Sequence, residues 1–163
     1  MGFRKTMSSV TIQQKGITEI AADAIVNAAN SALWAGGGVC GAIFSKAGME
    51  ELTAACNAIG HCDEGSAVIT PGFGCPCKYI IHAVGPQYID GKHGEADALY
   101  GAYKSSLELC RKNDIHSVVF PLISAGIFGY PLRDAWTQAK LFRRLAVTTF
   151  ASGIRLSQKT QSR

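Results

Sequence analysis

Two asparagines and a group of glycines lie close together near the start of the chain. Asn27 and Asn30 follow a short apolar run, residues 24–26, which is typical of a buried strand. Three consecutive glycines at 36–38 and then Gly41 precede a stretch with the apolar pattern of a helix. Glycine lets a backbone approach a ligand closely, and the first turn of a helix offers free N–H groups. These residue types in this order predict an anion site, for which a diphosphate is the natural ligand.

The segment 36–41 also fits the G-x-G-x-x-G pattern of dinucleotide-binding folds. In that fold the glycine turn follows its strand directly, whereas residues 27–35 intervene here. The acidic residue expected at the end of the next strand is also missing, because the region after Gly48 has the pattern of a helix. The sequence therefore disfavours a redox dehydrogenase. Loop flexibility alone is less typical of four glycines at this spacing.

A second glycine-bearing loop follows another apolar run. Residues 117–121, SVVFP, predict a buried strand, and the loop after it ends at Pro131, which suits the first turn of a helix. In α/β sheets, ligands bind beyond the carboxyl ends of the strands. The loops 30–41 and 122–130 both leave strands at such an edge. We therefore expect the two loops to hold a diphosphate from opposite sides.

Strand and helix patterns alternate along the chain, which is typical of an α/β domain with a mixed or mostly parallel sheet. Strand patterns cover residues 10–13, 24–28, 66–70, 79–84, 117–121 and 146–150. Helix patterns cover residues 18–22, 42–47, 49–59, 95–113 and 131–144. The nearly continuous apolar strands indicate a sheet that is covered on both faces. His82 lies in one of these runs, and we expect it to be a core residue.

Length and composition predict one globular domain, since the 163 residues are 47% hydrophobic and 17% charged. We expect a flexible N-terminus at 1–9, a folded domain at 10–150 and a basic, disordered tail at 151–163. Residues 1–138 carry 10 basic and 12 acidic side chains, whereas residues 139–163 carry six basic and no acidic ones. Because the folded part has no basic footprint, nucleic-acid binding is the least favoured function.

The chain shows neither a bilayer-spanning apolar run nor the pattern of a signal peptide. We therefore expect a cytoplasmic protein that does not bind membranes, and a monomer. The six cysteines are then expected to be reduced thiols. The pairs His61-Cys62 and Cys75-Pro76-Cys77 lack the usual C-x-x-C spacing of zinc sites. Small residues in a loop are the simpler interpretation, so we expect neither a metal nor a cofactor.

Four motifs together resemble the macrodomain family, whose members bind ADP-ribose, over residues 10–139. They are DAIVNAAN at 23–30, GGGVCGAI at 36–43, HAVGP at 82–86 and PLISAGIFGYP at 121–131. The resemblance implies a three-layer α/β/α sandwich around a central mixed, mostly parallel sheet. It is strongest to the MacroD-type enzymes, which remove ADP-ribose from modified acidic side chains and deacetylate O-acetyl-ADP-ribose. ADP-ribose, free or attached to a protein, is the partner that the resemblance implies.

The resemblance also implies a role for each matching position. Gly37, Gly38, Val39 and Gly41 would wrap the distal ribose and help to hold the diphosphate, and Asn27 and Ile43 belong to the same motifs and are expected to contact the ligand. The segment Ser124, Ala125, Gly126, Ile127 and Phe128 would offer main-chain N–H groups to the phosphates, with Phe128 packed on the distal ribose. Asn30 would bind the hydroxyls of that ribose. Gly16 and Ile17 lie where the family holds the adenine.

Two positions depart from the family pattern. Gly16 stands where the family has an aspartate that accepts a hydrogen bond from the adenine amino group. Losing a hydrogen bond to a charged group costs about 1.5–3 kcal/mol if nothing replaces it. Cys40 stands where MacroD-type enzymes carry an aspartate near the attacking water. A thiol is mostly protonated at neutral pH, so we expect weaker general-base catalysis.

The sequence therefore leaves two functions open. One is an ADP-ribosyl hydrolase and O-acetyl-ADP-ribose deacetylase with Asn30 and Cys40 as the catalytic residues, slowed by the thiol. The other is a module that binds ADP-ribose without turning it over, which the same thiol favours. Cys40 could also be no more than a small residue that fits the loop.

Overall fold

The computed structural model describes residues 5–12, 15–141 and 154–161 of the chain. Its elements are β1 Lys5–Ile12, a short 3₁₀ helix η1 Ile17–Glu19, β2 Ala22–Ala28, α1 Gly38–Ala47, α2 Met49–Ile59, β3 Ala67–Pro71, β4 Cys77–Ala83, α3 Glu95–Lys112, β5 Ser117–Phe120, α4 Leu132–Lys140 and β6 Ile154–Gln161. The strand predicted at 146–150 lies outside the described residues. Among those residues, no helix is both long and apolar enough to cross a bilayer.

The described strands form one sheet in the order β1-β6-β5-β2-β4-β3. β2 runs parallel to β4 and to β5 at the centre. β3 is antiparallel to β4, and β6 is antiparallel to both β5 and β1. Four of the six described strands thus point the same way, and the prediction of a mixed sheet is confirmed.

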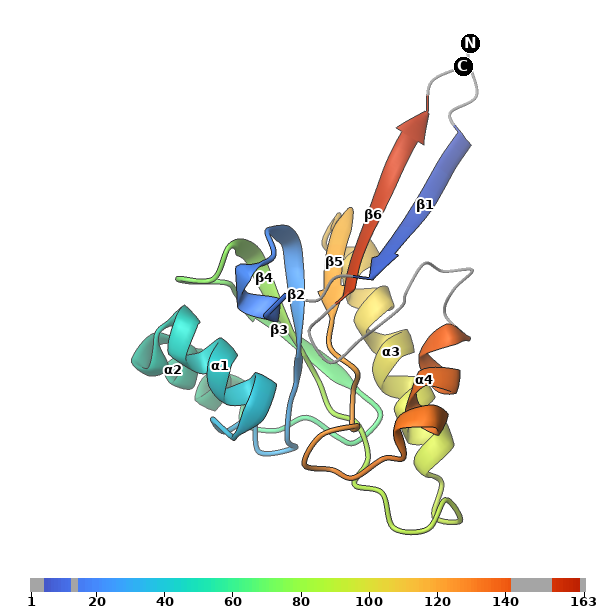
Figure 1. The fold of residues 1–163 in the computed structure, drawn as a ribbon. Helices are drawn as coiled ribbons and strands as arrows, with labels where there is room; N and C mark the ends of the chain where they lie inside the picture. Colours follow the sequence, from blue (N-terminus) through green and yellow to red (C-terminus); the bar gives the residue numbers. More distant parts are fainter. Residues whose placement is uncertain (1–4, 13–14, 142–153, 162–163) are drawn as a thin grey trace.

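Helices cover both faces of the sheet, with α1 and α2 on one side and α3 and α4 on the other (Figure 1). Alternation along the strands divides the core accordingly. Ala24 and Val26 pack with α3 and α4, whereas Ile25 packs with α1 and α2. β4 alternates in the same way, because Ile80 and Ile81 belong to opposite cores. The predicted three-layer sandwich is therefore confirmed.

The two ends of the chain differ from the prediction. β1 begins at Lys5, inside the segment expected to be a flexible N-terminus. The expectation of a disordered tail at 151–163 is wrong for 154–161, because these residues form β6 between β1 and β5. Ile154–Ser157 pair with β5 on one side and β1 on the other, so main-chain hydrogen bonds hold a strand that has few apolar residues.

The two glycine loops leave the same edge of the sheet, as predicted. β2 and β5 are parallel neighbours, so the loops that follow them start side by side (Figure 1). The first loop is tight where α1 begins. A Cβ at Gly41 would lie 2.5 Å from the carbonyl oxygen of Gly36, so only glycine fits there. Gly38, with a φ of +58°, turns the chain into the helix.

Candidate functional site

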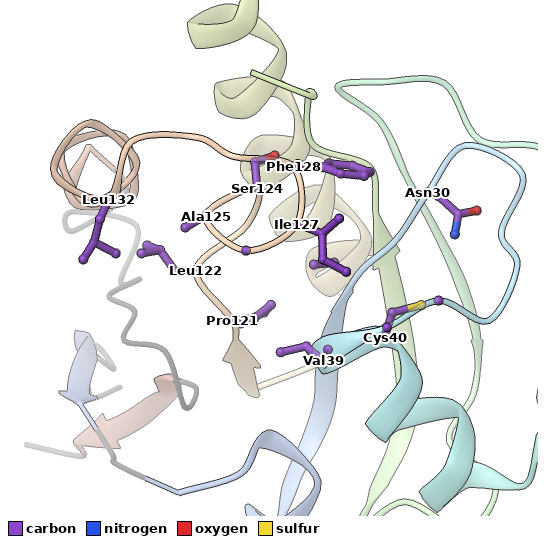
Figure 2. Close-up of a pocket in the computed structure, with 15 residues that line it drawn as sticks. Asn30, Val39, Cys40, Pro121, Leu122, Ser124, Ala125, Ile127, Phe128 and Leu132 are labelled. Carbon is purple, nitrogen blue, oxygen red and sulfur yellow. The ribbon is translucent and has the colours of Figure 1, made fainter. Parts of the chain in front are cut away.

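A cavity of about 520 Å³ lies between the two glycine loops, within the range of small-molecule sites (Figure 2). Ten of the predicted site residues line it: Asn30, Gly37, Gly38, Val39, Cys40, Ser124, Ala125, Gly126, Ile127 and Phe128. Five further residues complete the lining: Ala28, Gly36, Pro121, Leu122 and Leu132. Gly36 belongs to the glycine run noted in the sequence, Ala28 ends β2, Pro121 and Leu122 follow β5, and Leu132 begins α4.

Both loops that line the cavity carry main-chain N–H groups without a hydrogen-bond partner in the described part of the chain. On the first side, Gly38, Val39 and Cys40 form the first turn of α1, whose N–H groups have no partner within the helix. On the second side, the N–H groups of Gly126 and Ile127 donate to no acceptor in the described part of the chain. Two sets of N–H donors around one cavity suit an anion with more than one phosphate.

No charged side chain takes part in this anion site. Among the described residues that line the cavity, Cys40 carries the one ionisable side chain. Any negative charge there would be met by N–H dipoles and the positive end of the α1 dipole. Because these N–H dipoles are fixed by the main chain, they select a phosphate by where its oxygens lie and not by its net charge.

Ser124 belongs to the same wall, with its hydroxyl buried behind it. Its backbone has a φ of +66°, in the left-handed region that non-glycine residues rarely adopt. The side chain is 5% exposed, and its Oγ is buried with no hydrogen-bond partner in the described structure. A Cβ at Gly85 would collide with this oxygen, so the glycine makes room for it. Because this oxygen is closed to the cavity, the main chain of Ser124, and not its hydroxyl, is what a ligand in the cavity would contact.

Asn30 is already engaged within its own loop. Its Oδ1 accepts the N–H of Trp34 at 3.0 Å, and its Nδ2 donates to the carbonyl of Trp34 at 2.9 Å. The indole of Trp34 is 68% exposed, so the main chain of this residue is held while its ring is in solvent. Asn30 therefore shapes the cavity wall, and a ligand hydroxyl would share its amide with Trp34.

The Cys40 thiol lies in the cavity wall with two polar neighbours. Its Sγ donates to the carbonyl of Trp34 and accepts the Nδ2–H of Asn27, each at 3.6 Å. The residue is 6% exposed, so the sulfur is reached through the cavity rather than from the open surface. Figure 2 shows Cys40 and Asn30 on the same side of the cavity, across from Ile127 and Ser124.

A family model described as Macro domain matches residues 26–139, which is more than half of the chain and contains both glycine loops. The chain belongs to the macrodomain family. The resemblance found in the four sequence motifs is thereby confirmed.

Relatives and solved structures agree with this assignment. The macrodomain is 46% identical over 128 residues to "O-acetyl-ADP-ribose deacetylase" of Escherichia fergusonii, covering 76% of this chain and 72% of the relative. A structure of the Oceanobacillus iheyensis macrodomain with ADP has a TM-score of 0.78 and 32% identity, covering 89% of this chain and 86% of that one. The Trypanosoma brucei macrodomain in complex with ADP-ribose has a TM-score of 0.74 and 34% identity, covering 85% of this chain and 60% of that one.

Five predicted ligand contacts do not line the cavity of this macrodomain. Ile17 and Ile43 are 5% and 0% exposed and belong to the core beside α1. Gly41 packs against the main chain of Gly36. Gly16 is an exposed residue before η1, where its carbonyl accepts the N–H of Glu19. Asn27, at 1% exposed, lies behind Cys40 in the core.

His82 lies in the core, as expected from its apolar neighbours. It is 0% exposed, and burial lowers its pKa to about 4, so the ring is neutral at pH 7. Its Nδ1 lies 3.1 Å from the Nδ2 of Asn27, and its Nε2 lies 3.0 Å from the Oγ1 of Thr70. The polar neighbours of this histidine are therefore buried groups and not the cavity.

The loop before α3 supports the second glycine loop. The N–H of Tyr88 donates to the carbonyl of Phe128 at 2.8 Å, and the rings of Tyr88 and Tyr130 meet edge to face with centroids 5.0 Å apart. Glu95, at 2% exposed, holds this supporting loop. Its carboxylate accepts main-chain N–H groups from Ile89, Asp90, Gly91 and His93.

These N–H groups also determine the charge state of Glu95. Burial would raise the pKa of this carboxyl, but the N–H groups of Gly91, Ile89 and His93 outweigh burial and hold the pKa at about 2. Among the described residues, Glu95, Asp90 and His93 are the one group whose side chains could hold a metal ion. Because both Glu95 oxygens already accept N–H groups, the cluster is suited to ordering the loop rather than to binding a cation.

Proposed function

We propose that this macrodomain binds ADP-ribose, with the diphosphate held between the first turn of α1 and the loop at 124–128. The observation that carries the proposal is the presence of unpartnered N–H groups in both loops that line the cavity, including Gly38 in one loop and Gly126 in the other. A diphosphate has two groups of oxygens that accept from opposite directions. The complexes of similar macrodomains with ADP and with ADP-ribose support the same ligand class.

The distal ribose would lie beside Asn30, Cys40 and Phe128, which share one cavity. Apolar side chains of Val39, Ile127 and Leu132 would cover the sugar and exclude water from the phosphates. The adenine would lie toward Gly16, outside the cavity lining, as the family pattern implies. Since no carboxylate stands at that position, we expect adenine to contribute less to affinity than in relatives that have one.

We further propose that the site hydrolyses esters of ADP-ribose. The substrates would be O-acetyl-ADP-ribose and ADP-ribose attached to acidic side chains of proteins. In each case the oxygen of water forms the new bond, the ester bond breaks, and a carboxylic acid and ADP-ribose are released. The name of the Escherichia fergusonii relative, O-acetyl-ADP-ribose deacetylase, supports this reaction class.

Turnover is expected to be slow. The described cavity lining offers no carboxylate or imidazole as a base, and the Cys40 thiol is itself a hydrogen-bond donor to the Trp34 carbonyl. Positioning of water by the bound phosphate, Asn30 and the loops would then supply most of the rate. The same absence of a strong base favours the second candidate function, a module that binds ADP-ribose without hydrolysing it.

One sample can test both steps. Calorimetric titration with ADP-ribose, ADP and AMP should give affinities that fall in this order, because ADP lacks the distal ribose and AMP also lacks the diphosphate. The same sample is then mixed with O-acetyl-ADP-ribose and with mono-ADP-ribosylated protein, and released ADP-ribose is measured. Absence of binding heat for ADP-ribose would reject the proposal. Tight binding without release at high protein concentration would leave the binding module as the function.

A further inference from the structure

A row of buried polar side chains runs from the cavity wall into the core. It begins at the Cys40 sulfur and continues through Asn27, His82 and Thr70, which are 1%, 0% and 4% exposed. The successive distances are 3.6 Å from Cys40 Sγ to Asn27 Nδ2, 3.1 Å from Asn27 Nδ2 to His82 Nδ1, and 3.0 Å from His82 Nε2 to Thr70 Oγ1. The row ends where the Thr70 hydroxyl donates to the carbonyl of Pro71 at 3.2 Å.

The sheet brings these residues together. Asn27 on β2 pairs with His82 on β4, so their side chains lie next to each other on the face that α1 covers. Thr70 is on β3, which pairs with β4. Three strands thus contribute one polar group each beneath the helix that carries Cys40. Both amide contacts of Asn27 are made by its Nδ2, whereas its Oδ1 is buried without a partner in the described structure. Buried polar groups are costly unless partnered, so the two contacts of Nδ2 fix how the amide is oriented.

The hydrogen bonds have a direction that can be worked out from the far end. We assign the Thr70 hydroxyl as the donor to Pro71, which leaves its oxygen to accept the Nε2–H of His82. The Cys56 sulfur is a second neighbour of the same nitrogen, at 3.9 Å. The neutral ring then leaves Nδ1 as an acceptor, which takes one hydrogen of the Asn27 amide. The second hydrogen of that amide points at the Cys40 sulfur. In this arrangement the sulfur accepts an N–H from the core and keeps its own hydrogen for the Trp34 carbonyl.

We propose that Thr70, His82 and Asn27 are positioning residues that hold an N–H donor on the Cys40 sulfur and thereby fix its orientation and reactivity in the cavity. An N–H donor aimed at the sulfur restricts its orientation and stabilises the negative charge on the sulfur as it attacks an electrophile. The row therefore supplies the Cys40 sulfur with a hydrogen-bond donor from the core. The consequence for catalysis rests on the proposed function, whereas the effect on the sulfur does not.

Thr70 offers the sharpest test. It contacts His82, and His82 contacts Asn27, so Thr70 acts on the sulfur only through these two residues, and it does not line the cavity. Thr70→Val keeps the shape of the side chain and removes the hydroxyl. Thr70→Ser keeps the hydroxyl and removes a methyl group. If Thr70 serves only packing, valine should be tolerated and serine should be worse. If the Thr70 hydroxyl directs the hydrogen bonds of the row, serine should be tolerated and valine should be worse.

The readout is the rate at which iodoacetamide alkylates Cys40, measured by mass spectrometry of the Cys40 peptide in the folded protein. In Thr70→Val, the Nε2–H of His82 loses its oxygen acceptor at 3.0 Å and keeps the Cys56 sulfur at 3.9 Å, a weaker acceptor. The proposal is that the ring proton then moves to Nδ1 and the Asn27 amide turns its oxygen toward the Cys40 sulfur. We expect the Cys40 rate to fall about 3- to 10-fold, corresponding to loss of one hydrogen bond. Thr70→Ser should stay within about twofold of the wild-type rate.

His82→Gln is the second variant if Thr70→Val does not fold, because it removes the Nδ1 acceptor and keeps a polar group near Thr70; a similar fall in rate is expected. The proposal is overturned if the valine variant matches the wild-type rate, or if serine slows alkylation as much as valine does. Protection of Cys40 by ADP-ribose is measured in parallel. If the Thr70 variants change the alkylation rate but ADP-ribose does not protect Cys40, the role of Thr70 is supported and ADP-ribose is rejected as the ligand.

Discussion

Asn30 and Trp34 are joined by two hydrogen bonds between one side-chain amide and the main chain four residues later. The amide accepts the N–H of Trp34 at 3.0 Å and donates to its carbonyl at 2.9 Å. The same carbonyl accepts the Cys40 thiol at 3.6 Å. The side chain proposed to bind the distal ribose therefore also fixes the loop that carries the first glycines, and the two roles have to be separated by experiment.

Asn30→Ala and Asn30→Asp separate them. The aspartate keeps an acceptor for the Trp34 N–H and loses the donor to its carbonyl, whereas alanine loses both. We expect alanine to lower the free energy of unfolding by about 1–2 kcal/mol, and aspartate to lower it less. Hydrolysis should be abolished in alanine. Urea unfolding and the hydrolase assay measure the two effects, and an alanine variant with full activity would remove Asn30 from the mechanism.

Gly85→Ala tests the fit of Ser124 in the cavity wall. The added Cβ would collide with the Ser124 Oγ and lie 2.6 Å from Cγ2 of Ile123. We expect overpacking to cost about 1–3 kcal/mol of stability and to weaken ADP-ribose binding by displacing the cavity wall at Ser124. Thermal unfolding and calorimetry give the two quantities.

Ser124→Gly provides the matched control for that substitution. It removes the hydroxyl and relieves the φ of +66°, so the double variant with Gly85→Ala should regain stability and ADP-ribose binding together. If the double variant is no more stable than Gly85→Ala alone, the collision with Ser124 is not the cause.

The lowered pKa of Glu95 predicts that the free energy of unfolding falls at acid pH. Its pKa is about 2 in the folded protein, below the ordinary value of 4.5. A lowered pKa contributes stability that is fully present above the unfolded value and is lost as pH falls from about 4.5 through about 2. Glu95→Gln should be less stable at pH 7 and lose less stability across that window. Denaturant unfolding at a series of pH values checks this, and equal slopes for the two proteins would contradict it.

Cys40→Asp tests whether the thiol limits hydrolysis. The carboxylate would accept the Asn27 N–H that the sulfur now accepts, and it would be a stronger base for water. A positioned general base contributes about 10²–10⁴-fold, so we expect kcat to rise at least tenfold. Cys40→Asn has the same shape without the charge and is the control, for which no gain is expected. Equal turnover in the aspartate variant and the wild type would show that Cys40 is not the limiting group.

The fold and the cavity wall followed from local patterns that fix backbone geometry. The apolar runs of β2, β4 and β5 and the glycines of both loops gave the sheet centre and the position of the cavity. The sequence shows two asparagines with similar surroundings, of which Asn30 lines the cavity and Asn27 does not. Strand alternation places Asn27 on the same face as Ile25, under α1, whereas Asn30 lies beyond the strand end.

Strand β6 and the row of buried polar residues could not be predicted from local patterns, because both depend on contacts between distant segments. β6 has Ile154 and Leu156 as its apolar residues, so composition alone favoured a tail, whereas pairing with β1 and β5 makes it a strand. The row from Thr70 to Cys40 combines three strands and one helix. Its members are 12 to 55 residues apart at the His82 contacts, and no local pattern links them.

The most direct test of the central claim is amide NMR of the protein during titration with ADP-ribose. Binding of the diphosphate by main-chain N–H groups predicts large shifts of the amide resonances of Gly38, Val39 and Cys40 on one side and of Gly126, Ile127 and Phe128 on the other. Both sets should move together and saturate at one equivalent of ligand. Resonances in these two loops that stay unchanged at saturating ADP-ribose would contradict the account.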